Sequence, residues 1–157
     1  MAVNRSHRYG LVLWILLALF AFRVAAQLIA LFVPSTVLPD FEAWHSGVLP
    51  YWLLVASQIA ILALLAWTAR HFSSGAVHPS RPAGVAALTF GALYFTTMLA
   101  RLVLGLTVLS DRRWFSSRLP TFFHLVLASY LLVFAWFHIV HAAAPVDRQD
   151  RHGGSEL

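Results

Sequence analysis

Long apolar stretches separated by short polar ones dominate the pattern along this chain. Four stretches are almost continuously apolar, and they cover residues 9–33, 50–70, 84–110 and 120–142. An α-helix rises about 1.5 Å per residue, so each stretch is long enough to cross a hydrocarbon core about 30 Å thick. Apolar and polar residues do not alternate as they do in the strands of a membrane barrel. The pattern therefore predicts an all-α integral membrane protein with four transmembrane helices.

Residues that end helices separate the apolar stretches. The breakers of the first two connections are Pro34, Pro39, Gly47, Ser73, Ser74, Gly75, Pro79 and Pro82. Pro50 and Pro120 fall in the first turns of the second and fourth predicted helices, where a missing N–H costs little. Short connections join antiparallel neighbours. We predict one four-helix domain over residues 1–144, followed by a polar tail at 145–157.

Composition excludes the other broad classes of protein. Hydrophobic residues make up 60% of the 157 positions and charged residues only 11%, whereas soluble domains are about half apolar and a quarter charged. The same values exclude intrinsic disorder, which requires low hydrophobicity and high charge. The chain contains no cysteine, so disulfides, zinc–thiolate sites and iron–sulfur clusters are excluded.

The distribution of arginines predicts an orientation. All 11 basic residues are arginine, and they lie scattered rather than in the stripe that tracks a nucleic acid. With the N-terminus inside, six of them flank the helices on the cytoplasmic side: Arg5, Arg8, Arg70, Arg81, Arg148 and Arg151. Three lie on the outer side: Arg112, Arg113 and Arg118. Because basic residues favour the cytoplasmic side, we expect both termini in the cytoplasm and the protein in the inner (plasma) membrane. The lipid bilayer is its expected partner, and nucleic acid is not.

The N-terminal stretch has an alternative interpretation as a secretion signal. Arg5 and Arg8 precede an apolar run, and the residues at 24–26 resemble a signal-peptidase site. Cleavage after Ala26 would remove the first helix. The apolar run resumes at once over residues 28–33, which favours a retained transmembrane helix.

Polar residues inside the apolar stretches are the most informative for function. An arginine at the centre of a membrane helix costs about 2.5–3.5 kcal/mol to insert, and no Asp or Glu lies inside any stretch to pair with Arg23 or Arg101. Counted from the outer helix ends, Arg23, Gln58, Arg101 and Tyr130 all lie about 12–15 Å deep. Gln27 shares a helix face with Arg23. These five residues are the predicted ligand-binding residues, in one polar layer in the outer half of the bundle.

Three interpretations of this layer remain open at the level of sequence. It could be a structural polar core, a binding site for an anionic or amphiphilic ligand, or two arginines that reach from the lipid to the headgroups. The leading functional hypothesis is a small inner-membrane binding or accessory protein. Pairs of small residues would also allow close packing with a partner subunit or a second copy.

The segment between the first two helices provides candidates for catalysis. It carries Asp40, Glu42 and His45 between two prolines, and carboxylates with an imidazole can perform general acid–base chemistry. Positioned over the arginine layer, they would suit a membrane enzyme that acts on a lipid or isoprenoid-like substrate. An inert lid would have the same composition.

Histidines suggest a redox alternative. His124 and His138 fall on nearly the same face of the fourth predicted helix, with His45 and His71 on the matching sides of the membrane. This arrangement resembles four-helix di-haem cytochromes b, in which histidines on facing helices hold stacked haems. The resemblance implies haem b between the second and fourth helices, although the first predicted helix lacks a histidine. Histidines that end helices at the membrane interface are the alternative. No other metal site is predicted.

Overall fold

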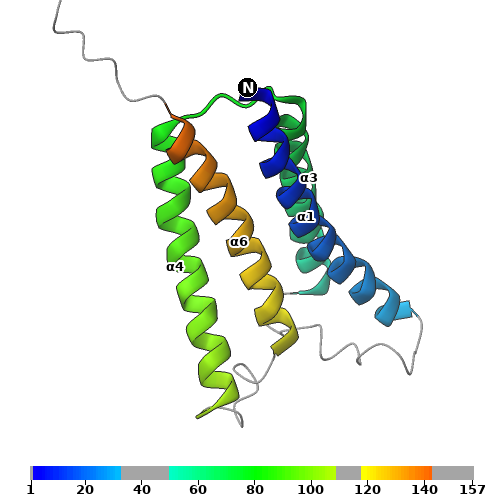
Figure 1. Cartoon of the computed structure of the whole chain (residues 1–157). Coiled ribbons are helices and arrows are strands. Elements are labelled where there is room, and N and C mark those ends of the chain that lie inside the picture. The colour runs from blue at the N-terminus through cyan, green and yellow to red at the C-terminus, as the bar shows by residue number, and fades with distance from the viewer. Residues whose placement is uncertain (1, 33–49, 109–117, 143–157) are drawn as a thin grey trace, which may run out of the picture.

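Four long helices make up the described part of the protein. The structure is a computed structural model that describes residues 2–32, 50–108 and 118–142 (Figure 1). The helices are α1 (Ala2–Phe32), α3 (Tyr51–Ser74), α4 (Arg81–Leu106) and α6 (Arg118–His141). No strand occurs in the described ranges. Each helix contains a segment of 23 to 26 residues that is long and apolar enough to cross a membrane. The prediction of an all-helical bundle with four helices of membrane length is therefore confirmed.

Several helix boundaries differ from the predicted ones, among them the starts of α1 and α4. Helix α1 begins at Ala2 rather than near residue 9, because its first turns pack on the end of α3: Gly10 lies against the Ser73 backbone, and Ser6 is buried. Helix α4 begins at Arg81, so the interpretation of Pro82 as a breaker was wrong. Pro82 lies in the first turn, where its missing N–H breaks no helical hydrogen bond.

Helix α3 continues to Ser74, four residues beyond the predicted end, so the interpretation of Ser73 and Ser74 as breakers was wrong as well. Gly75 then adopts a left-handed φ of 72°. The N–H of Gly75 bonds to the Phe72 carbonyl, and the N–H of Ala76 bonds to the His71 carbonyl. Glycine ends helices in this way because it has no Cβ to clash in the left-handed conformation.

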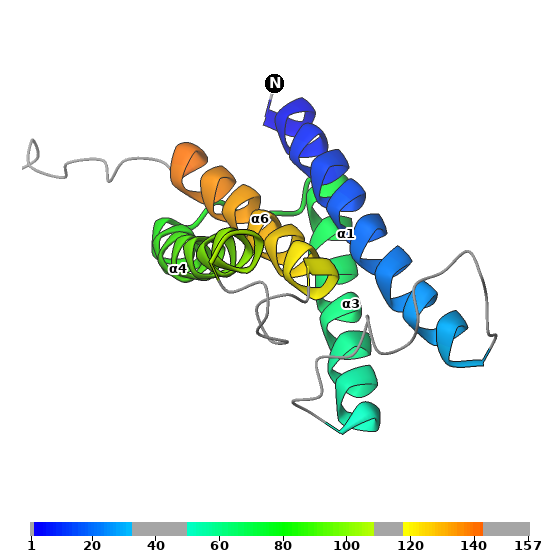
Figure 2. The same cartoon turned by 90° about the horizontal axis from the view of Figure 1, so that it is seen from below.

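The helices alternate in direction and pack in the spatial order α4, α6, α1, α3. The most extensive contact joins α4 to α6, followed by α1 to α3 and α1 to α6. The beginning of α1 and the end of α6 lie at the same end of the bundle (Figures 1 and 2). If the helices cross a membrane, this arrangement places both of those helix ends on one side.

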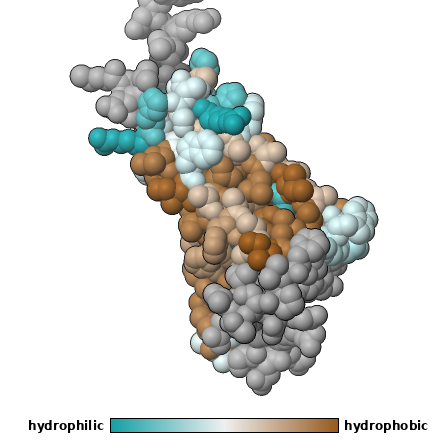
Figure 3. All heavy atoms as spheres, turned by 90° about the vertical axis from the view of Figure 1, so that its right-hand side faces the viewer, coloured by the Kyte–Doolittle hydropathy of each residue, from teal (hydrophilic) through white to brown (hydrophobic). Residues whose placement is uncertain are grey.

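The apolar core is formed by α1, α3 and α6. Its buried members are Leu13, Leu17, Phe20, Val24, Leu65, Ala69, Phe72, Tyr130 and Phe137. Helix α4 contributes no residue to this cluster. The surface of the described part is also strongly apolar. Figure 3 shows hydrophobic residues over most of one described face and hydrophilic residues near one end. Such a surface suits contact with lipid rather than water.

Helix α4 instead packs on α6 through glycines. Gly84, Gly91 and Gly105 are buried at intervals of seven and fourteen residues, which keeps them on one helix face. A Cβ at Gly84 would lie 2.9 Å from the His138 Cβ and 2.9 Å from the Ile139 Cγ1. The two backbones therefore approach as closely as the absence of a side chain allows.

Candidate functional site

Arg23 lies inside the bundle, on the face of α1 that meets α6. It is only 7% exposed, and its guanidinium carbon lies 5.6 Å from the centroid of the Phe123 ring. A cation over an aromatic face gains electrostatic stabilisation, and the gain is larger away from water. Ala26 and Val126 pack against the same Phe123 ring. The geometry is incompatible with an arginine that points into lipid.

A glutamine pair joins α1 to α3 one turn along from Arg23. Gln58 Nε2 donates a hydrogen bond to Gln27 Oε1 over 3.2 Å, and the two side chains are 4% and 0% exposed. This bond leaves Gln27 Nε2 and Gln58 Oε1 buried without a hydrogen-bond partner among the described residues. A buried polar atom without a partner costs about 1–3 kcal/mol. The pair therefore has one donor and one acceptor available for a further molecule.

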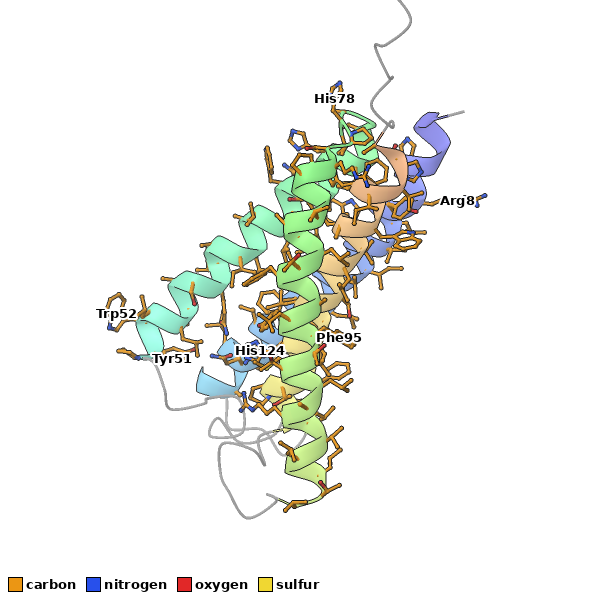
Figure 4. The ribbon with its side chains drawn as sticks, turned by 90° about the vertical axis from the view of Figure 1, so that its left-hand side faces the viewer. Arg8, Tyr51, Trp52, His78, Phe95 and His124 are labelled. Carbon is orange, nitrogen blue, oxygen red and sulfur yellow. The ribbon has the colours of Figure 1, made fainter. Side chains whose placement is uncertain are left out.

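Arg101 is the buried charged residue of α4, at 6% exposure. Two turns earlier on α4, the Tyr94 hydroxyl lies 2.6 Å from His124 Nδ1 and joins α4 to α6. Arg23 and Arg101 are both within electrostatic range of the His124 ring, and Arg23 also acts on Tyr94. In Figure 4 the His124 ring lies next to α4, toward the C-terminal end of α1. The two arginines, from helices at opposite sides of α6, thus converge on one region.

Tyr130 belongs to a different part of the bundle. It is 2% exposed, and its hydroxyl donates a hydrogen bond to the Leu65 carbonyl over 2.7 Å. Leu65 lies seven residues beyond Gln58, or about 10 Å along α3. Tyr130 therefore connects α6 to the middle of α3 and does not join the other predicted ligand-binding residues. We name Arg23, Gln27, Gln58, Arg101, Tyr94 and His124 the arginine site.

The predicted catalytic residues Asp40, Glu42 and His45 lie outside the described residues. The same is true of the other acidic residues, Asp111, Asp147, Asp150 and Glu156. Within the described ranges, arginine is therefore the only residue type that is fully charged at neutral pH. The acid–base hypothesis for the segment at 40–45 stays a prediction.

The structure describes three of the four candidate haem ligands, His71, His124 and His138, and gives each of them contacts with protein groups. The Ser80 backbone N–H donates to His138 Nδ1 over 3.0 Å, so the ring proton of neutral His138 is on Nε2. Neither nitrogen then has a free lone pair for iron. The His71 ring packs on Trp67 at a centroid distance of 4.3 Å, on the exposed side of α3. No group of three possible metal ligands occurs in the described ranges. His45 lies outside them.

Sequence analysis did not identify the Tyr94–His124 pair. A signal was present, since Tyr94 precedes Arg101 by seven residues and lies on the same face of α4. The partner of Tyr94 could not be read from spacing, because the contact depends on how α4 lies against α6. Comparison of the chain with protein-family models, with curated proteins and with solved structures finds no match.

Proposed function

We propose that the chain is a small multi-pass protein of the inner membrane that binds an anionic or amphiphilic ligand at the arginine site. One observation carries the proposal: Gln27 is fully buried one helical turn from the buried Arg23, and its amide donor has no hydrogen-bond partner among the described residues. A buried donor next to converging positive charge favours an acceptor that is negatively charged.

The chemistry of the site suits a carboxylate or a phosphate. A guanidinium presents several N–H donors in a planar fork that matches two oxygens of such a group. Gln27 Nε2 would supply another donor, and Gln58 Oε1 could accept from a hydroxyl or a bridging water. The apolar side chains of Phe123, Ala26 and Val126 next to Arg23 would contact the apolar part of an amphiphile.

The glutamine pair allows a test that preserves the packing. In the double variant Gln27→Leu with Gln58→Leu, both partners of the hydrogen bond become apolar, so stability should be nearly unchanged. We expect the ligand that co-purifies with the wild-type protein to be lost. Native mass spectrometry of the detergent-purified protein measures the bound mass, and thermal unfolding measures stability.

A matched control lies at the other end of the same two helices. The Trp14 indole N–H donates to Ser73 Oγ over 3.0 Å and also joins α1 to α3. The double variant Trp14→Phe with Ser73→Ala should retain the bound mass. Equal bound mass in the glutamine double variant and the wild-type protein would exclude a ligand at the arginine site.

We also propose that both termini face the cytoplasm, because six arginines on that side oppose three on the other. A reporter enzyme that is active only outside the cytoplasm, fused after residue 157, should then remain inactive. The same reporter fused after residue 45 should be active. The reverse pattern would show the opposite orientation and would place the arginine site in the inner half of the membrane.

A further inference from the structure

An open groove lies where the first turns of α1 meet the last turn of α6. Its volume is about 460 Å³, and it is lined by Arg8, Tyr9, Val12, Val140 and His141. The arginine site does not include any of these residues. Arg8 precedes Arg23 by 15 residues, which corresponds to about 22 Å along α1. The groove is therefore separate from the site of the proposed function.

Aromatic contacts hold one wall of the groove in place. The Tyr9 ring meets the edges of Phe137 and His141 at centroid distances of 5.2 Å and 5.6 Å. His141 also stacks on Phe137 at 4.7 Å, and its Nδ1 lies 3.0 Å from the Phe137 carbonyl. A carbonyl only accepts, so Nδ1 carries the proton and Nε2 is the ring nitrogen left for another molecule.

The second polar group of the groove is the guanidinium of Arg8, which is carried on a long side chain. Arg8 is exposed, and Figure 4 shows it extending outward from α1 near the end of the bundle. Val12 and Val140, which are 42% and 52% exposed, add apolar surface to the groove. The groove thus combines a cation and an imidazole with two exposed valines.

The position of these groups in the predicted spans identifies the kind of ligand. Arg8 and His141 lie within two residues of the ends of the apolar segments Ser6–Ala30 and Leu119–His141. Val12 lies one turn further into its segment than Arg8. Phospholipids place their phosphate at the membrane interface and their acyl chains below it. A water-soluble anion would make no favourable contact with the exposed valines.

We propose that this groove binds one anionic phospholipid of the leaflet on the N-terminal side. The phosphate contacts Arg8, a hydroxyl of the headgroup donates to His141 Nε2, and the first part of an acyl chain covers Val12 and Val140. The described part of the chain contains no acidic residue that would repel such a headgroup.

The test uses the full-length protein in nanodiscs that contain equal amounts of phosphatidylglycerol and phosphatidylcholine. Lipid retained on the protein after release is identified by native mass spectrometry. We expect the wild-type protein to retain phosphatidylglycerol in preference to phosphatidylcholine. Arg8→Gln should lower the retained phosphatidylglycerol about fivefold, the effect of one basic residue near an anionic surface. Val12→Trp, which fills the groove and keeps the charge, should lower it as well.

The control is Arg70→Gln, because Arg70 is also exposed but lies on α3, away from the groove. This variant should retain as much phosphatidylglycerol as the wild-type protein. In a second control, glycerol phosphate added to the wild-type protein should displace none of the retained phosphatidylglycerol. An equal loss in the Arg8 and Arg70 variants would overturn the proposal in favour of unspecific charge attraction. Displacement by glycerol phosphate would overturn it in favour of a site for soluble phosphate.

Discussion

Replacement of Gly84 by leucine is expected to separate α4 from α6 and to lower the free energy of unfolding by about 3 kcal/mol. The Cβ alone would lie 2.9 Å from both His138 Cβ and Ile139 Cγ1, and 3.1 Å from the Ile139 backbone nitrogen. A backbone atom cannot rotate away, so α4 must move. The movement would also break the hydrogen bond from the Ser80 N–H to His138 Nδ1. Thermal unfolding in detergent measures the effect.

Ala86→Leu is the matched control, because Ala86 is exposed on the same helix two residues away. It adds a larger side chain without entering the contact with α6 and should unfold like the wild-type protein. A Gly84→Leu protein as stable as the Ala86→Leu protein would contradict the close approach of α4 and α6. Gly91→Ala should be milder, since its nearest contact is 3.2 Å, to the Leu131 Cβ.

Replacement of Arg101 by leucine is expected to abolish ligand binding while stability changes by less than about 1 kcal/mol. Arg101 is 6% exposed, and a leucine at this position avoids the cost of keeping a cation away from water, which offsets the contacts that the guanidinium loses. Arg101→Lys retains the charge but loses the planar fork, so it should bind the ligand only weakly. Bound mass and thermal unfolding, measured on the same preparations, check both expectations.

The same variants distinguish a ligand from an internal ion pair. If Asp40 or Glu42 neutralised Arg101 in a fully buried pair, Arg101→Leu would strand a carboxylate and cost about 3–5 kcal/mol. A second change, Asp40→Asn or Glu42→Gln, would then restore part of the loss. That result, with unchanged bound mass, would establish a structural role for Arg101 and contradict the proposed function.

The packing of α4 explains why these two predictions are connected. Helix α4 has no residue in the apolar core cluster and is held against α6 by a face of glycines. Yet α4 carries Tyr94 and Arg101, the two polar side chains that interact with His124 of α6. Glycine contacts allow the backbone of α4 to lie close enough for short-range pairing with α6. A Gly84→Leu protein that still folds should therefore also bind less ligand.

Sequence alone determined the four apolar helices and favoured burial of the polar residues within them. Hydropathy is a local property, so stretches of membrane length are visible without knowledge of the fold. An arginine or glutamine in such a stretch is costly in lipid, which favoured an interior position for Arg23, Gln27, Gln58 and Arg101, although arginines that reach the headgroups remained an alternative. The starts of α1 and α4 could not be predicted from hydropathy. Helix α1 begins early because its first turns pack on α3, and α4 begins before a proline that the first helical turn tolerates.

Only the tertiary structure decided which polar groups meet. Depth counted from a helix end placed Tyr130 with the arginines, but its hydroxyl bonds to the Leu65 carbonyl instead. Tyr94 pairs with His124, although spacing along the chain connects Tyr94 only with Arg101. A residue count measures height along one helix, whereas contact also depends on the rotation of each helix and on its neighbours. Those are determined by packing, here by the buried glycines of α4 and the apolar core that α1, α3 and α6 share.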